Sequence, residues 1–483
     1  MINSYYSEAI HETVKKWLNA TFFDSISYLW PPMRRSSAII YISPFKECDY
    51  TMKTLFKNCD IVASADSGFE VIRNGFCGVD GAYIRYLGTD MPAEKYDIVK
   101  DMTGKVLCPG LINSHNHAAM TLLRGIGSDL PLKEWLYDNM FPTEDKLRTE
   151  DVKAGTELAI LEMLATGTVS FSDMYYFCDA TADCVIESGI KANISRALSA
   201  FDPNEAYKDS YRVKEALALY DSYNGAADGR LKIDLSVHAE YTCLESIARR
   251  HSEMCSELGA IMHIHLSETK AEHDSCIEKY GRTPAQWFYD LGTFESPTLA
   301  AHCVWVTDED IALMKEYGVS PVHCPTSNLK LGSGFARVQH LLDEGLNVGL
   351  GTDGAASNNN LNMLEELHLC SVIHNGYEQD PTIMKPGDTL KMATLNGAKI
   401  QGRADCGGIK VGNRADVIAL DFDKPHLLPS FDPIAMLCYS AQGSDVCMTM
   451  VDGRILYENG EFLTMDKERI YHDLKKALKH LYD

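Results

Sequence analysis

Residues 109–120 read PGLINSHNHAAM, an apolar run after Pro-Gly that ends in two histidines one residue apart. Alternate side chains on a strand point the same way, so His115 and His117 can converge on one point. A metal ion is the natural occupant of that point, and a pair of surface or core histidines is the alternative. The rest of the chain has to distinguish the two.

Eight apolar, β-rich runs, beginning with this one, alternate with helical patterns such as residues 153–167 and 309–318. The runs are 111–117, 168–174, 191–198, 232–240, 260–268, 299–305, 319–325 and 347–354. Eight strands that alternate with helices over this length predict an α/β fold, a (β/α)8 TIM-like barrel over residues 108–403.

Shorter β-like runs lie on both sides of the barrel region, with turn residues between them. They are residues 54–63, 81–88, 105–110, 415–422 and 447–462. We expect residues 52–107 and 404–465 to form one small β-sandwich domain from two distant segments, with a C-terminal helix over 466–483.

Residues 1–51 differ in composition from the rest of the chain, with five Lys/Arg against five Asp/Glu and ten aromatic residues. Trp30-Pro31-Pro32 interrupts any long element there. This atypical N-terminal extension is either an extra helical arm or sequence upstream of the working initiator, Met52. We favour the second interpretation, so a chain that begins at Met52 is expected to be soluble and active.

Composition restricts the partners and the compartment. The net charge is −23 among 483 residues, which argues against nucleic acid or an anionic membrane as a partner. Fifteen cysteines are scattered without a Cys-x-x-Cys motif, which fits a reducing compartment. There is no apolar stretch long enough to cross a bilayer and no signal-peptide layout at the N-terminus. We expect a cytoplasmic protein.

Polar residues recur at the carboxyl ends of the predicted strands, where (β/α)8 barrels hold their chemistry. They are His115, His117, His238, His265 with Glu268 just beyond it, His302 and Asp353. Of these, three imidazoles and a carboxylate suit a divalent ion such as zinc: His115, His117, His265 and Asp353. His263 should lie deeper as a core residue, whereas His323 either supports the metal ligands or belongs to the core.

A bound metal ion would activate a water molecule, and the neighbouring side chains would then move protons. Glu268, kept protonated by burial, can donate to a ring nitrogen, while His302 and Asp353 can take the proton of the water. The fourth strand reads LSVHAEYT, without the lysine that bridges two ions in other barrels of this architecture. One metal ion is therefore expected.

Five motifs carry a family resemblance: residues 109–136, 263–269 (HIHLSET), 300–304 (AAHCV), 324–334 (CPTSNLKLGSG) and 351–359 (GTDGAASNN). In this order they resemble the amidohydrolase superfamily, and most closely its 5′-methylthioadenosine/S-adenosylhomocysteine deaminases. The resemblance runs from about residue 54 to the end. It implies a hydrolase that replaces the 6-amino group of an adenine nucleoside, releasing ammonia and the inosine analogue. The family's barrels commonly pair, which allows a homo-oligomer.

The resemblance also assigns residues. It implies that His115, His117, His265 and Asp353 hold one divalent ion, zinc or alternatively ferrous iron, that Glu268 shuttles a proton to purine N1, and that His302 orients the attacking water. The substrate-binding residues that it implies are Glu134 on the ribose hydroxyls, Arg196 and Arg212 on the 5′ side, His238, Glu268 and Asp353.

Alternatives remain at this point. Guanine, other purine nucleosides and substituted triazines are substrates of similar enzymes, and a non-catalytic relative would keep the barrel only as a binding module. Residues 236–243 (SVHAEYTC) stand where a Gly-Pro-His-Ser-Pro-Tyr type of sequence is common in the family, so the pocket wall near His238 differs. This difference bears on the 5′ preference and not on deamination.

Overall fold

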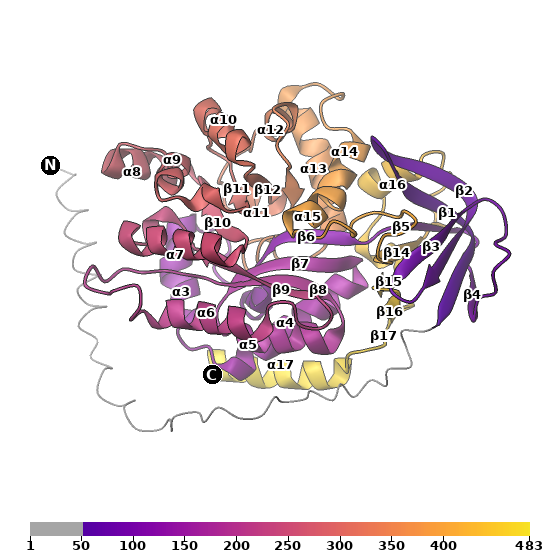
Figure 1. Ribbon diagram of the computed structural model, residues 1–483, viewed down its shortest axis with the longest axis horizontal. Helices are drawn as coiled ribbons and strands as arrows, with labels where there is room; N and C mark the ends of the chain where they lie inside the picture. The colour runs from indigo at the N-terminus through magenta and orange to yellow at the C-terminus, as the bar shows by residue number, and fades with distance from the viewer. Residues whose placement is uncertain (1–51) are drawn as a thin grey trace. The chain divides into compact units, whose positions relative to one another are not determined.

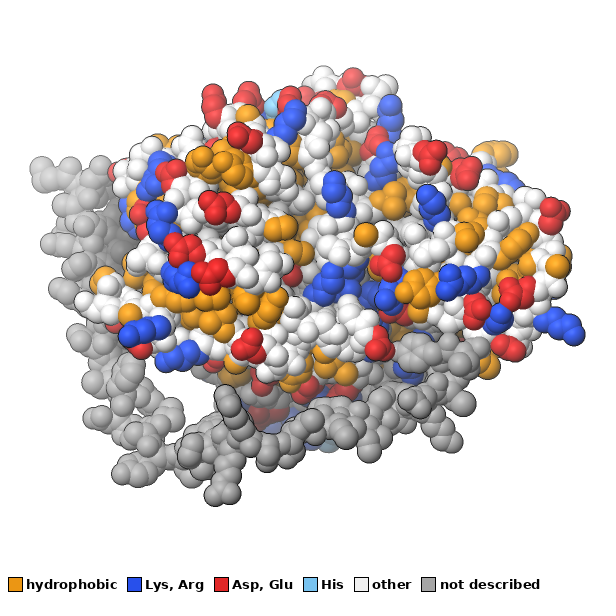
Figure 2. Space-filling model, in the orientation of Figure 1, with side chains coloured by type: hydrophobic (Ala, Val, Ile, Leu, Met, Phe, Trp, Pro, Cys, Tyr) orange, Lys and Arg blue, Asp and Glu red, His pale blue; other side chains and the backbone are white. Residues whose placement is uncertain are grey.

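The computed structural model describes residues 52–483, and the expectations for residues 1–51 lie outside this range. The described chain contains a parallel barrel covered by helices and a second, mixed sheet (Figure 1). Figure 2 shows acidic and basic side chains interspersed over the face viewed, so neither sign of charge is concentrated there. Within residues 52–483, every helix is too short or too polar to cross a bilayer.

All eight predicted barrel strands are present, pair in parallel and follow one another around the barrel in chain order. They are β6 (Leu111–Asn116), β7 (Thr168–Tyr175), β8 (Lys191–Arg196), β9 (Leu231–Val237), β10 (Met262–Leu266), β11 (Thr298–His302), β12 (Ser320–His323) and β13 (Gly349–Leu350). Their residues are almost all buried, as expected for strands with helices outside and packed side chains inside.

The barrel closes where its last strand, β13, meets its first, β6. The backbone N–H of Asp353 donates to the carbonyl of His115 at 3.0 Å, and that of Thr352 donates to Asn113 Oδ1 at 3.0 Å. A Cβ on Gly351 would lie only 2.8 Å from the backbone nitrogen of His115. Glycine at this position therefore allows the two strands to approach.

Helices fill the connections between the strands and cover the barrel. The longer ones are α4 (Thr149–Ala165), α5 (Cys178–Ser188), α6 (Tyr211–Tyr223), α7 (Glu245–Leu258), α8 (Lys270–Tyr280), α10 (Asp308–Tyr317) and α13 (Met363–Glu378). The shorter ones are α2 (Leu132–Glu134), α3 (Phe141–Glu144), α9 (Pro284–Asp290), α11 (Pro325–Lys330), α12 (Val338–Asp343), α14 (Pro386–Met392), α15 (Leu395–Ile400) and α16 (Pro433–Tyr439).

The predicted C-terminal helix is present as α17 (Lys467–Tyr482), which packs against α4. Its buried residues, Ile470, Ala477 and Leu481, recur at helical spacing and give it one apolar face. Arg469 adds an ion pair to the buried carboxylate of Glu157 on α4, at 2.8 Å. The helix thus completes the outer layer of the barrel.

The small β domain expected from both chain ends is one continuous sheet of nine strands. They are β1 (Lys53–Ala65), β2 (Gly68–Asp80), β3 (Tyr83–Gly88), β4 (Ile98–Asp101), β5 (Lys105–Pro109), β14 (Val417–Asp421), β15 (Val446–Val451), β16 (Arg454–Glu458) and β17 (Glu461–Phe462). Residues of both halves, such as Phe56 and Met450, share one apolar core, so the sheet folds over itself as a sandwich does. The domain boundaries remain a prediction.

Two features tie this sheet to the barrel. Only Gly110 separates β5 from β6, so one extended segment runs from the sheet into the strand that carries His115. Lys191 on β8 donates to Asp416 and, at 2.7 Å, to Asp452, both beside strands of the small sheet. Since all three side chains are nearly inaccessible to solvent, this ion network is a buried one.

Candidate metal centre and substrate cavity

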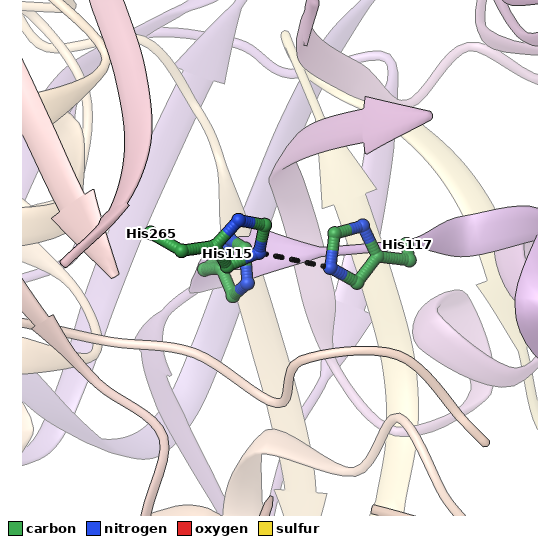
Figure 3. A group of neighbouring side chains, drawn as sticks. All are labelled: His115, His117 and His265. Atoms are coloured by element: carbon green, nitrogen blue, oxygen red, sulfur yellow. Dashed lines mark hydrogen bonds between the residues drawn. The ribbon is translucent and has the colours of Figure 1, made fainter. Parts of the chain in front are cut away.

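Three imidazoles meet at the mouth of the barrel, as predicted (Figure 3). His115 and His117 come from β6 and its end, and His265 comes from β10, opposite them in the strand order. The Nε2 atoms of His117 and His265 are 3.3 Å apart, and each residue can offer a ligand atom within 4.8 Å of the others. The sequence pattern therefore identified a group that converges in space.

Hydrogen bonds on the far side of each ring determine which nitrogen faces the centre. His117 Nδ1 lies 2.5 Å from the carbonyl of Met174, and His265 Nδ1 lies 2.7 Å from the carbonyl of His238. A carbonyl only accepts, so both Nδ1 atoms carry the proton and both Nε2 lone pairs point into the centre. This is the arrangement of histidines that bind metal.

His263 lies deeper in the barrel, as expected, but it does more than fill space. Its Nε2 is 2.8 Å from His115 Nδ1, and both side chains are fully buried. The contact fixes the ring of His115 from below. His263 therefore orients a predicted ligand, which the sequence pattern alone did not indicate.

Asp353 completes the predicted ligand set. Its Oδ1 lies 3.3 Å from His115 Nε2 and 3.2 Å from His117 Nε2. Ser327 and Ser357 donate to its Oδ2 at 2.7 and 2.6 Å. Burial disfavours the carboxylate, but the adjacent imidazoles of His115 and His117 outweigh it and hold the pKa of Asp353 well below its usual value.

The donor set fits a divalent metal ion. His115 Nε2 is buried and has no hydrogen-bond partner, although Asp353 Oδ1 is 3.3 Å away. The two groups therefore point to a common position rather than at each other. Three imidazole nitrogens and one carboxylate oxygen suit zinc, and the same donors accept ferrous iron.

Glu268 follows β10 on a loop that a local motif holds in place. Thr269 and Glu272 form a capping box: Thr269 Oγ1 accepts from the N–H of Glu272 at 3.1 Å, and Glu272 accepts from the N–H of Thr269 at 3.3 Å. Glu272 also accepts from the N–H of Glu268 at 2.8 Å. The carboxyl of Glu268 accepts from Ser333 Oγ at 3.2 Å. Burial raises the pKa of Glu268, which favours the protonated form.

His302 faces Glu268 across the centre, with Nε2 3.8 Å from Glu268 Oε2. Its Nδ1 donates to Asn328 Oδ1 at 2.8 Å, which leaves Nε2 directed at the site. Burial lowers the pKa of His302, but the carboxylates of Glu268 and Asp353 outweigh this effect and raise it overall. Both His302 and Asp353 have left-handed backbones, with φ of 72° and 60°, a strained conformation that is common at functional sites.

His238 also lies at the centre, at the end of β9. Its Nδ1 is 3.2 Å from Thr242 Oγ1, and its ring lies against that of His265 with centroids 4.7 Å apart. Burial lowers the pKa of His238 to about 3, so the ring is neutral at pH 7. A neutral ring can accept or donate one hydrogen bond to a substrate group.

An open cavity lies above the centre. Six of the predicted residues line it: His117, His238, His265, Glu268, His302 and Asp353. The rest of the wall is mostly apolar and aromatic, and it includes Trp135, Tyr175 and Tyr176. A mostly apolar cavity with a few convergent polar groups is typical of a small-molecule site.

The three residues expected to recognise the sugar and its 5′ substituent do not line this cavity. Glu134 is exposed on α2, although its neighbour Trp135 lies in the wall. Arg196 is buried, donates to Glu215 at 2.8 Å and lies 5.3 Å from the ring of Tyr176. Arg212 is half-buried, and its charge also lowers the pKa of Tyr176, so both arginines lie near one wall of the cavity.

Sequence reasoning missed several polar residues of the site. Glu144 lines the cavity and accepts from Tyr175 at 2.7 Å, and burial raises its pKa. Ser327, Ser357 and Asn328 hold Asp353 and His302. The last three belong to the CPTSNLKLGSG and GTDGAASNN motifs, so the sequence marked these residues without showing their roles.

The chain belongs to the amidohydrolase family, whose model matches residues 106–456. It is 42% identical over 431 residues to a 5-methylthioadenosine/S-adenosylhomocysteine deaminase of Caldanaerobacter subterraneus subsp. tengcongensis, covering 89% of this chain and 99% of the relative. A 5′-deoxyadenosine deaminase of Methanosarcina acetivorans is 42% identical over 410 residues, covering 85% and 94%. The crystal structure of an adenosine deaminase from Xanthomonas campestris with bound zinc superposes with a TM-score of 0.83 at 29% identity, covering 89% of this chain and 98% of that one.

Proposed function

We propose that this protein is a metal-dependent deaminase of 5′-substituted adenosines, with 5′-methylthioadenosine and S-adenosylhomocysteine as the first candidates. One observation carries the proposal: His117, His265 and Asp353 of the predicted ligand set line one cavity together with the buried acid Glu268, and His115 lies beside them within ligand distance. The names of the similar enzymes support the substrate class. 5′-Deoxyadenosine and adenosine remain further candidates.

The proposed cofactor is one divalent ion, zinc in the first place, held by His115, His117, His265 and Asp353. Such an ion lowers the pKa of water from 15.7 to about 7 and so makes hydroxide accessible at neutral pH. The directed Nε2 atoms of the histidines and the ionised Asp353 support this assignment.

Two proton transfers fall to the side chains around the cavity. We assign Glu268 to protonate a ring nitrogen of the purine, N1 in the family's chemistry, because burial raises its pKa and so favours the protonated acid. His302 and Asp353 lie where they can take the proton of the attacking water and later pass it to the departing amine. In the overall reaction the C–N bond to the amino group breaks, a C–O bond forms, and ammonia and the inosine analogue leave.

Substrate recognition is proposed for Glu134, Arg196, Arg212 and His238, together with Glu268 and Asp353. Glu134 lies one residue from the cavity wall, so a change of its side-chain rotamer would bring a carboxylate towards a ribose diol. The arginines near Tyr176 supply positive charge for the homocysteine carboxylate. Neither guanine nor a triazine ring carries a carboxylate that these arginines could pair with.

The test is ammonia release from 5′-methylthioadenosine, S-adenosylhomocysteine, 5′-deoxyadenosine and adenosine, with guanine as a control. We expect release from the 5′-substituted nucleosides with higher kcat/KM than from adenosine. Release from guanine alone would contradict the nucleoside assignment. We also propose a cytoplasmic location, which the absence of any disulfide among residues 52–483 supports.

A further inference from the structure

A second cluster of metal-binding side chains lies apart from the cavity. His323 ends β12, and Cys370 and His374 are on α13. Each can offer one ligand atom within 4.8 Å of the other two. Cys370 and His374 are four residues apart, so they share one face of the helix. All three are buried, with at most 5% of any of them exposed.

The two rings are hydrogen-bonded at a distance that is also close to the spacing of two ligands on one ion. The Nε2 atoms of His323 and His374 lie 3.1 Å apart. Two nitrogens at zinc–nitrogen distances of about 2.0–2.1 Å in a tetrahedron are separated by about 3.3 Å. The rings therefore need only small movements to bind a shared ion.

A small cavity lies beside the rings. His323, His374 and Asn328 line it, and it has room for about one water molecule. His323 Nδ1 and Asn328 Nδ2 are buried there without a hydrogen-bond partner among the described residues. An unsatisfied buried polar group costs about 1–3 kcal/mol, so these two atoms indicate that something polar occupies the cavity.

We propose that His323, Cys370 and His374 form a second metal site, for zinc or a similarly thiophilic divalent ion, with a water molecule as the fourth ligand. Imidazole nitrogen and thiolate sulfur are both ligands that zinc takes. Binding replaces the Cys370 S–H bond with a metal–sulfur bond and releases one proton to solvent, with no change of oxidation state. This site is distinct from the predicted catalytic centre, whose four ligands include no sulfur.

The second site is positioned to influence the first. Asn328 connects the two sites. Its Oδ1 accepts from His302 Nδ1 at 2.8 Å. The same residue lines the small cavity, and its Nδ2 has no hydrogen-bond partner among the described residues. A ligand that accepts from Nδ2 fixes the amide in the orientation that holds His302. Occupancy of the second site would therefore reduce the freedom of the His302 ring.

Cobalt(II) distinguishes the two centres. The full-length protein is stripped of metal, reloaded with cobalt and examined for thiolate-to-cobalt charge-transfer absorption in the near ultraviolet. Since the catalytic centre has only nitrogen and oxygen ligands, this absorption reports the second site alone, whether or not the first is filled. We expect the absorption, and two equivalents of cobalt per chain by elemental analysis.

Cys370→Ser and His374→Gln should each lose the absorption and one equivalent of metal. Cys255→Ser is the matched control, since Cys255 is also a buried helix cysteine but donates to the carbonyl of Ala260. That variant should keep both signals. The wild-type spectrum is decisive by itself: one equivalent without charge-transfer absorption would overturn the proposal, even if a variant failed to fold.

Discussion

Glu268→Gln is the most direct perturbation of the proposed chemistry. Glutamine keeps the size of the side chain and can still bond Ser333 Oγ, which lies 3.2 Å from the carboxyl, but it cannot supply a proton. Asp353, also in the cavity wall, is held ionised beside His115 and His117 and cannot replace Glu268 as an acid. General acid catalysis contributes roughly 10²–10⁴-fold, or about 3–5 kcal/mol of barrier.

We therefore expect kcat of Glu268→Gln to fall by at least about a hundredfold, with KM changed much less. The assay is ammonia release at saturating 5′-methylthioadenosine, with metal content measured on the same sample. Ser333→Ala is the control, because loss of one neutral hydrogen bond is worth about 0.5–1.5 kcal/mol and should cost roughly tenfold or less. A Gln variant that retains metal and more than a tenth of the wild-type kcat would refute the role of Glu268.

Four further outcomes are expected. Gly351→Ala forces β13 away from β6 and should lower the free energy of unfolding by about 1–3 kcal/mol in urea, whereas Gly376→Ala, whose Cβ meets nothing within 4 Å, should not. Lys191→Met leaves the buried Asp416 without its cation and Asp452 with Arg414 alone, and should cost about 3–5 kcal/mol in the same experiment. Arg212→Ala should raise KM for S-adenosylhomocysteine roughly tenfold or more but hardly for 5′-methylthioadenosine, which has no carboxylate. Burial raises the pKa of Glu268, so the acid keeps its proton below that raised pKa and loses it as the pH rises through it. We therefore expect kcat/KM to fall on the alkaline side of a pH–rate profile.

The barrel strands could be predicted from the sequence because their surroundings are apolar on both faces. Each barrel strand is buried on both faces, so a short apolar run suffices to identify it. β2 and β4 escaped the sequence analysis for the opposite reason. β2 is largely half-exposed and its pairing with β1 is interrupted by bulges, and β4 has only four residues. Neither has a regular alternation of apolar and polar residues that could be recognised.

Strand periodicity also limited what could be predicted of the site. It placed His115 and His117 on one side of a strand, and the structure agrees. It could not show that Ser357 on a loop reaches Asp353, because loop geometry has no such period. The family resemblance assigned Glu134 to the substrate, but the direction of its side chain depends on local packing.

The pairing of β6 with β13 affects the order in which the protein folds and binds metal. The proposed ligands lie on the first strand of the barrel, on a middle strand and just beyond the last one, so the set is incomplete until the final strand has docked. During synthesis, His115 and His117 emerge long before Asp353. We therefore expect tight metal binding to be one of the last events of folding, and a chain stalled before residue 353 to hold metal only weakly. Tight metal binding would then be limited to fully synthesised and folded chains, and the ion would stabilise a barrel that had already closed.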